Sequence, residues 1–325
     1  MSNQNVIPIF FASDNNYLPF LAVSITSLLE NASTDYHYNI YILNNGLDEK
    51  KIAPILHMKR ENADIRLVDV SGSLQPIAER LNLRDYYTIS IYFRLFIASM
   101  FPQYHKAIYL DADIAVNGDI SKLYEVQLGQ NLVGAVSDDI IASRHDFRLY
   151  AEEAVGVPYQ RYFNSGVLLM NLDQFRLNRI EQKFVYLLET YHFDTVCPDQ
   201  DYLNALCKDR VLYLDKGWNK MSIDTDYPGV PNLIHYNMFY KPWLYRKIAY
   251  GEFFWRYAEK TPYFDELKRV QESFGFKGKL EHKRAHWNLH VTTRRIRKQP
   301  NNFRCVLNRE SVEAMAWDLE DGKNA

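Results

Sequence analysis

The chain has 325 residues, of which 47% are hydrophobic and 24% charged, with a formal net charge of −2 at pH 7. This length and composition predict a globular protein with one large domain, or a domain with an appendage, and the charge gives no reason to expect a nucleic-acid partner. The longest apolar stretch near the N-terminus, LPFLAVSITSLL, is too short for a membrane span and follows a polar cluster, so we expect neither a span nor a signal peptide, and a cytoplasmic protein. Three cysteines that match no CxxC spacing predict reduced thiols: Cys197, Cys207 and Cys305.

Strand-like and helix-like segments alternate along the first part of the chain. Apolar runs predict strands at residues 6–12, 38–43 and 64–70. Between them, LPFLAVSITSLL repeats at helical spacing, and LDEKKIAPILHMKREN carries its apolar residues on one face. This alternation predicts a parallel sheet covered on both faces, with ligands beyond the carboxyl ends of the strands.

The alternation of strand-like and helix-like segments continues to about residue 245. A helix is predicted in ISIYFRLFIASMF, followed by a strand in KAIYLDADIAV that runs directly into two acids. Further strands are predicted at 131–139, 163–172 and 210–214, and helices at 179–193 and 199–207. No linker or internal repeat interrupts this region, so we expect one mixed α/β domain over residues 1–250.

From residue 251 the sequence becomes aromatic, charged and helical in pattern, which predicts a C-terminal helical, basic extension over 251–325. Residues 277–304 contain nine Lys or Arg against one acid, Glu281, and the apolar residues Trp287, Ile296 and Phe303 are interleaved with them. Such a segment can sit on an anionic membrane leaflet, where each basic residue contributes about 1 kcal/mol. We therefore expect peripheral contact with the inner face of a membrane, with a merely solvated basic face as the alternative.

Asp111 and Asp113 follow the apolar strand in IYLDADIAV. Residues two apart in an extended chain point to the same side, so the two carboxylates converge beyond the strand. Convergent carboxylates repel unless a cation lies between them, and Mg²⁺ and Mn²⁺ prefer oxygen ligands. An isolated DxD is more often a turn or a cap, but its place at the end of a strand favours a divalent cation that would also bind diphosphate oxygens.

Other polar residues lie near predicted strand ends and helix starts. His235 in NLIHYNMFYKPW is either a core histidine or a third ligand, and an imidazole suits Mn²⁺ better than Mg²⁺. Lys241 could supply a point charge to a phosphate. The remaining candidates are Asp138, Asn164, Asp199 and Gln200. The two carboxylates among them can be helix caps or site residues, whereas Gln200 has no capping role.

Several nucleotide and hydrolase motifs are absent from the sequence. No GxGxxG follows the first strand, and neither GxxxxGK[ST] nor GxSxG occurs. These absences argue against dinucleotide dehydrogenases, P-loop enzymes and α/β-hydrolases. The candidate residues named above, which are acids, amides, a histidine and a lysine, suit the binding of a diphosphate through a bridging metal ion.

The ordered motifs FASDNNY, SIYFR, YLDADIAV, YFNSGVLLMN, DQDYLN and HYxxxxKPW resemble glycosyltransferase family 8. This family holds retaining galactosyl- and glucosyltransferases, including bacterial lipopolysaccharide galactosyltransferases and glycogenin, and the resemblance covers roughly residues 5–245. It implies a GT-A fold, a single Rossmann-like domain with a mixed, mostly parallel sheet. It also implies UDP-galactose or UDP-glucose as donor, Mn²⁺ as cofactor with Mg²⁺ as the alternative, and a saccharide or glycolipid acceptor in cell-envelope or exopolysaccharide synthesis.

The resemblance also implies residue roles. The matching metal ligands are Asp111, Asp113 and His235. The matching donor-nucleotide and diphosphate contacts are Ala12, Asp14, Asn16, Arg94 and Lys241. The residues that match the donor-sugar lining are Asp138, Asn164, Asp199 and Gln200. Because an amide such as that of Gln200 is a poor nucleophile, we expect same-face attack by the acceptor through a short-lived ion pair rather than a covalent intermediate.

Met238 departs from the family pattern. The last motif usually reads HYxGxxKPW, and a side chain in place of that glycine predicts a different backbone path beside the phosphates. The departure keeps open the alternative of a catalytically impaired nucleotide-sugar-binding protein. A sugar nucleotidyltransferase is a more remote alternative, because FFASDNNY is neither glycine-rich nor basic.

Overall fold

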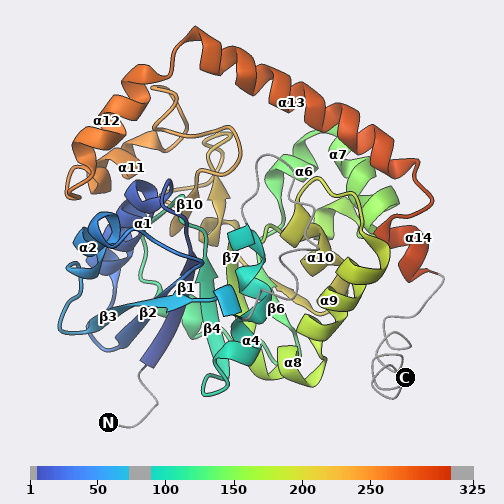
Figure 1. Ribbon diagram of the computed structural model, residues 1–325, viewed down its shortest axis with the longest axis horizontal. Coiled ribbons are helices and arrows are strands. Elements are labelled where there is room, and N and C mark those ends of the chain that lie inside the picture. The colour runs from blue at the N-terminus through green and yellow to red at the C-terminus, as the bar shows by residue number, and fades with distance from the viewer. Residues whose placement is uncertain (1–5, 73–88, 309–325) are drawn as a thin grey trace.

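A mixed seven-stranded sheet forms the centre of the computed structural model, which describes residues 6–72 and 89–308. Its strands are β1 (Val6–Ala12), β2 (His37–Asn44), β3 (Ala63–Asp69), β4 (Lys106–Leu110), β6 (Val133–Ala135), β7 (Val167–Asn171) and β8 (Val211–Tyr213). They lie in the order β3-β2-β1-β4-β7-β6-β8 (Figure 1). Only β7 runs against its neighbours, β4 and β6, and the other pairs are parallel. The sheet is therefore mixed and mostly parallel, as predicted.

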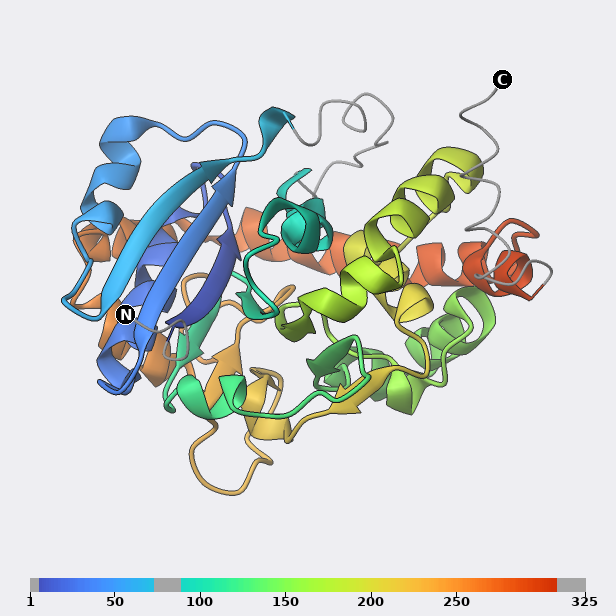
Figure 2. The ribbon, with the colours of Figure 1, turned by 90° about the horizontal axis from the view of Figure 1, so that it is seen from below.

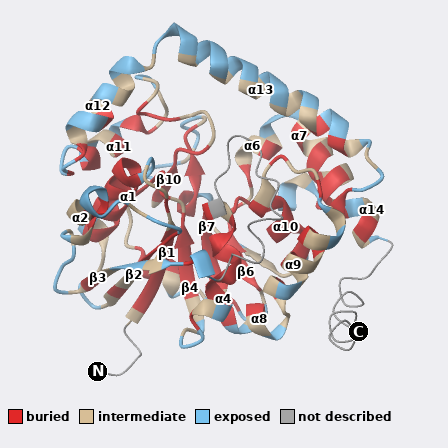
Figure 3. Ribbon diagram, in the orientation of Figure 1, coloured by how far each residue is buried: buried red, intermediate tan, exposed pale blue. Residues whose placement is uncertain are grey.

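Helices pack against both faces of this sheet, as the view in Figure 2 shows. The described helices before residue 251 are α1 (Leu18–Asn31), α2 (Glu49–Leu56), the 3₁₀ helix η2 (Ile89–Phe96), α4 (Ile97–Met100), α5 (Ser121–Tyr124), α6 (Asp139–Ser143), α7 (His145–Tyr150), the π-helix η3 (Ala151–Val155), the 3₁₀ helix η4 (Tyr159–Arg161), α8 (Leu172–Leu177), α9 (Ile180–Tyr191), α10 (Pro198–Leu206) and the 3₁₀ helix η5 (Lys216–Trp218). Alternation along β1 places Ile9 and Phe11 in one core with Leu21 of α1. Phe10 lies in the second core, with Phe184 of α9. Buried residues accordingly concentrate on the sheet and on the helix faces toward it (Figure 3).

The strand predicted to run into the two acids is confirmed as β4, which ends at Leu110, and the chain then leaves the main sheet. Asp111, Ala112 and Asp113 form the crossing, and β5 (Ile114–Val116) then joins a second sheet. That sheet has the order β5-β10-β9, with β9 (Lys220–Met221) and β10 (Leu233–His235). Antiparallel pairing sets His235 opposite Ile114. The strand switch thus brings the histidine beside the two acids, which no local pattern indicates.

Several predicted boundaries shorten for local reasons. The strand predicted at 131–139 ends at Ala135, since Asp138 already caps α6 by accepting from the backbone N–H groups of Ile140 and Ile141. The strand predicted at 163–172 begins only at Val167. After β6 and before β7 an isolated bridge pairs Ser137 with Phe163, and the polar residues Asp138 and Asn164 lie next to this bridge.

Between residues 251 and 308 the structure has four helices: α11 (Gly251–Ala258), α12 (Phe264–Ser273), α13 (Phe276–Arg297) and α14 (Phe303–Leu307). Phe254 of α11 shares an aromatic cluster with Phe20 and Trp243, whose rings stack at 4.1 Å. The long helix α13 runs from α12 across to α7, where Arg294 pairs with Asp146 at 2.8 Å (Figures 1 and 2). The helical character of this region agrees with the sequence, while the domain division at residue 250 stays a prediction and residues 309–325 lie outside the described part.

Two further sequence expectations concern the whole chain. All three cysteines are free thiols, as predicted. Across residues 6–72 and 89–308, the structure contains no helix whose length and apolar character would let it cross a membrane.

Candidate active site

A cleft of about 1420 Å³ opens at one edge of the main sheet. Ala12 ends β1, Asp111 follows β4, Asp138 follows β6, and Asn164 lies shortly before the reversed strand β7; all four line the cleft. The carboxyl ends of parallel strands and the amino end of an antiparallel strand meet at the same edge. The cleft therefore lies at the edge where the sequence predicted ligands.

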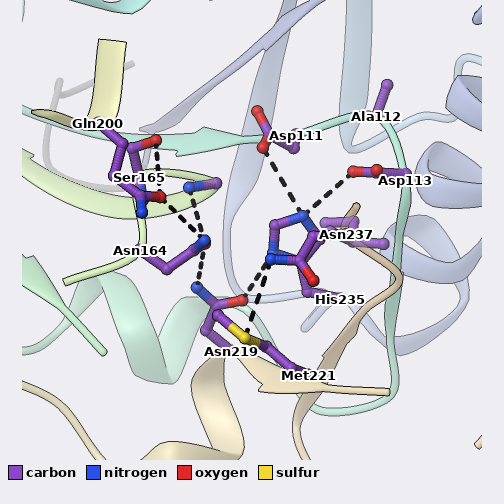
Figure 4. Close-up of polar contacts among 12 residues, drawn as sticks. Asp111, Ala112, Asp113, Asn164, Ser165, Gln200, Asn219, Met221, His235 and Asn237 are labelled. Atoms are coloured by element: carbon purple, nitrogen blue, oxygen red, sulfur yellow. Dashed lines mark hydrogen bonds and ion pairs between the residues drawn. The ribbon is translucent and has the colours of Figure 1, made fainter. Parts of the chain in front are cut away.

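Asp111, Asp113 and His235 converge at this edge, with one ligand atom from each lying within 4.8 Å of the others. His235 Nε2 lies 3.2 Å from Asp113 Oδ1 and 3.7 Å from Asp111 Oδ2 (Figure 4). This buried nitrogen has no hydrogen-bond partner among the described residues. Two carboxylates around an unpartnered imidazole nitrogen fit a divalent cation. The structure thus brings together the three residues predicted as metal ligands.

Gly166 leaves the space into which this cluster fits, and its role was missed by sequence analysis. A Cβ built on Gly166 would lie 2.5 Å from Asp111 Oδ2 and closer still to His235 Cε1. Both distances are too short for non-bonded atoms, so any side chain at this position would displace the ligands. The glycine in the motif YFNSG was the available signal.

Lys241 forms a buried ion pair with Asp113 beside the cluster. Burial acts to raise the pKa of Asp113, but Lys241 and His235 outweigh it and hold that pKa well below its ordinary value. The charge of Asp113 likewise raises the pKa of Lys241 against the opposing effect of burial. Both groups therefore stay charged at neutral pH, and both line the cleft.

Arg94 is a buried cation held between two acids. Its guanidinium lies 2.9 Å from Asp111 Oδ1 and 3.2 Å from Asp199 Oδ2, and it donates to the backbone carbonyl of Ser165 at 2.6 Å. Burial opposes its charge, but the two carboxylates raise its pKa above the ordinary value. The donor contact of Arg94 stays a prediction, and the structure shows that Arg94 holds Asp111 and Asp199 in position.

The predicted donor-sugar residues form a buried amide and carboxylate cluster. Gln200 Oε1 accepts from Asn164 Nδ2 at 3.0 Å and from the backbone N–H of Ser165 at 2.9 Å. Gln200 Nε2 and Asn164 Nδ2 each donate to Asp138 Oδ2 at 3.0 Å. Burial raises the pKa of Asp138, and burial also raises that of Asp199, against the opposing charge of Arg94. Both amide atoms of Gln200 are thus engaged in holding the cluster.

The motif after β1 divides into residues inside and outside the cleft. Ala12 and Asp14 line it, whereas Asn16 is exposed and is not part of the lining. Asp14 Oδ1 accepts from the backbone N–H groups of Asn16 and Tyr17, at 2.8 and 3.1 Å, and so closes the turn before α1. Tyr17 is a lining residue that the sequence did not single out.

Met238 lines the cleft with the left-handed backbone conformation that glycine favours, at φ 54°. The sequence predicted that a side chain here would divert the backbone. Its φ lies in the region that glycine favours and the residue lines the cleft wall, while the predicted difference in backbone path stays a prediction.

Comparison with known proteins gives consistent matches. The family model described as Glycosyl transferase family 8 matches residues 8–247. The lipopolysaccharide 1,2-glucosyltransferase of Escherichia coli K12 is 26% identical over 305 residues, covering 87% of this chain and 86% of that protein. The galactosyltransferase LgtC, crystallised with donor and acceptor sugar analogs, aligns with a TM-score of 0.64 and 27% identity over 79% of this chain and 96% of LgtC.

A second solved structure supports the architecture alone. The bifunctional glycosyltransferase WbbM, in its apo form, aligns with a TM-score of 0.72 at 23% identity. The match covers 84% of this chain and 53% of WbbM. Together with LgtC, it confirms the predicted α/β class and GT-A fold.

Proposed function

This chain belongs to glycosyl transferase family 8, and from that premise we propose that it transfers galactose or glucose from a UDP-sugar to a saccharide or glycolipid acceptor with retention of configuration. The acceptor belongs to cell-envelope, lipopolysaccharide or exopolysaccharide synthesis. Support for this choice comes from the lipopolysaccharide 1,2-glucosyltransferase of E. coli and from the galactosyltransferase LgtC, whose names state glucosyl and galactosyl transfer.

One observation carries the proposal: the unpartnered Nε2 of His235 beside Asp111 and Asp113. These three residues would hold Mn²⁺. The bound cation would supply Lewis acidity to the diphosphate as negative charge develops on the leaving UDP. Lys241, next to Asp113, adds a fixed positive charge at the same place.

The protein groups around the sugar pocket orient the donor and acceptor. Gln200 has both amide atoms hydrogen bonded, and Asp199 is paired with Arg94, so neither is a free nucleophile. We therefore favour attack by the acceptor hydroxyl on the same face from which UDP departs, through a short-lived ion pair. Asp138 and Asn164 would orient the sugar hydroxyls during this step.

The outer face of α13 is the proposed membrane contact, and it excludes Ile296 and Phe303, which the sequence assigned to it but which are each 1% exposed. Phe276 is 82% exposed and Trp287 is 66% exposed, and exposed Lys283 and Arg284 lie between them. Aromatic and basic side chains on one exposed helix suit an anionic lipid surface. Sedimentation with anionic and with neutral vesicles tests the assignment: replacing Phe276 and Trp287 together by serine should abolish binding to the anionic vesicles, and unchanged binding would contradict it.

The decisive experiment is UDP release across a panel of UDP-sugars, with Mn²⁺, with Mg²⁺ and with EDTA. We expect turnover of UDP-galactose or UDP-glucose that depends on Mn²⁺ and is lost in Asp111→Asn. UDP binding with no turnover of any donor would favour the impaired binding protein. Full activity of Asp111→Asn would contradict the metal site.

A further inference from the structure

The amide of Asn219 lies directly behind the imidazole of His235 (Figure 4). Asn219 stands between η5 and β9 and is 1% exposed. Its Oδ1 lies 3.0 Å from His235 Nδ1, and its Nδ2 donates to Asn164 Oδ1 at 2.9 Å. No sequence motif assigned a role to this residue, which lies in KGWNK.

Groups that can only donate or only accept fix the direction of every bond in this chain of contacts. The backbone N–H of Gly166 can only donate, and it contacts Asn164 Oδ1 at 3.0 Å. The amide nitrogen of Asn164 consequently faces Asp138, an acceptor that also receives two backbone N–H groups. Because Asn164 presents oxygen to Asn219, Asn219 must present its NH₂ group there and its oxygen to His235.

An oxygen that faces Nδ1 requires that Nδ1 carry the proton of the neutral ring. Nε2 then holds a lone pair, which points between Asp111 and Asp113. The opposite tautomer would place an N–H at 3.2 Å from Asp113 Oδ1, where the carboxylate would stabilise it as a hydrogen bond. Without a fixed acceptor behind the ring, the acids themselves would favour the tautomer that cannot bind a metal.

We propose that Asn219 is a positioning residue that selects the metal-binding tautomer and orientation of His235. The inference rests on the proposed function, since it requires a cation at Asp111, Asp113 and His235. It also joins the metal ligand to the sugar-facing cluster, because Asn164 contacts Asn219 and Gln200 through one amide. Hydrogen-bond partners of this kind commonly contribute 10-fold to 100-fold in metal affinity.

The test measures Mn²⁺ binding to the full chain by electron paramagnetic resonance of free Mn²⁺, with and without UDP, and needs no turnover. Asn219→Leu removes both hydrogen bonds and should raise the Mn²⁺ dissociation constant about 10-fold to 100-fold. Asn219→Asp also loses donation to Asn164 but keeps an acceptor for Nδ1–H, so its affinity should stay within about threefold of wild type. A purely structural role would weaken both variants alike.

Asn302 provides the matched control, because it is also 1% exposed and caps the remote helix α14. Asn302→Leu should lower thermal stability without changing Mn²⁺ affinity. If Asn219→Leu does not fold by circular dichroism, Asn219→Ala replaces it. The proposal is overturned if the Leu or Ala variant binds Mn²⁺ as tightly as wild type does. It is also overturned if Asn219→Asp binds Mn²⁺ no more tightly than the Leu or Ala variant. Absence of Mn²⁺ binding by the wild-type protein would overturn the metal assignment of the proposed function together with this inference.

Discussion

Replacing Gly166 by alanine should disable the metal cluster with a single added carbon. The new Cβ would lie 2.5 Å from Asp111 Oδ2 and closer to His235 Cε1. Ordinary contacts of this kind are about 3.5 Å or longer, so each ligand must withdraw by roughly 1 Å. Neither can do so freely, because Arg94 holds Asp111 at 2.9 Å and Asn219 holds His235 at 3.0 Å.

The size of the effect follows from these restraints. Forcing an extra carbon into a packed site typically costs about 1–3 kcal/mol of folding stability. A displacement of about 1 Å in two of three ligands should weaken Mn²⁺ binding, and a misplacement of that size can cost about 100-fold in UDP-sugar turnover. Titration of Mn²⁺ followed by electron paramagnetic resonance, at saturating UDP, measures the Mn²⁺ affinity, and urea unfolding measures the folding stability.

Gly118→Ala is the matched control for Gly166→Ala. A Cβ on Gly118 would also meet a side-chain oxygen at 2.5 Å, that of Asn232, but no metal ligand. It should therefore lose stability while retaining Mn²⁺ affinity. If folded Gly166→Ala binds Mn²⁺ within threefold of wild type, the ligands do not gather where the structure places them.

Three further predictions concern the surroundings of the cluster. Burial raises the pKa of Asp201 to about 6, above its value of 3.8 in an unfolded chain, although hydroxyls of Tyr150 and Tyr162 bind it. The folded state therefore binds this proton more tightly, and up to about 3 kcal/mol of stability is present below about pH 4 and lost as the pH rises through about 6. Asp201→Asn should remove that slope in urea unfolding between these pH values; an unchanged slope would contradict the assignment. In Arg94→Lys, the lysine lacks the planar guanidinium that spans Asp111 and Asp199. The variant should lose about 1–3 kcal/mol in free energy of unfolding and at least about 10-fold in turnover. A fully active variant would refute the positioning role. Met238→Gly removes the cost of a left-handed side-chain-bearing residue, about 1 kcal/mol, but adds a similar cost in backbone conformational entropy. The melting temperature should therefore equal that of wild type, and a large rise or fall would contradict this balance.

The sequence alone determined two kinds of feature: helices and strands with a periodic apolar pattern, and site residues that are neighbours in the chain. Alternating apolar runs and amphipathic helices predicted the mostly parallel sheet, because burial of each segment is decided by side chains close together in the chain. Asp111 and Asp113 were found for the same reason, since a strand end and its two acids are neighbours in sequence. Six ordered motifs then indicated the family, and the family match bears this out.

Only the tertiary structure decided how the remaining groups meet these acids. Pairing of β5 with β10 sets His235 opposite Ile114, and the two residues are far apart in sequence. The small sheet that creates this register is built from strands of two or three residues, too short to show a period.

The same limit explains Gly166 and Asn219. A glycine is needed where two ligands approach from different strands, and an amide is needed where a ring must be held from behind. Asn219 lies 16 positions from His235 and 55 from Asn164, so its hydrogen bonds leave no periodic trace. Local sequence fixes which face of a strand or helix is buried, whereas the direction of a polar contact across the fold depends on strand register and on which partners can only donate or only accept.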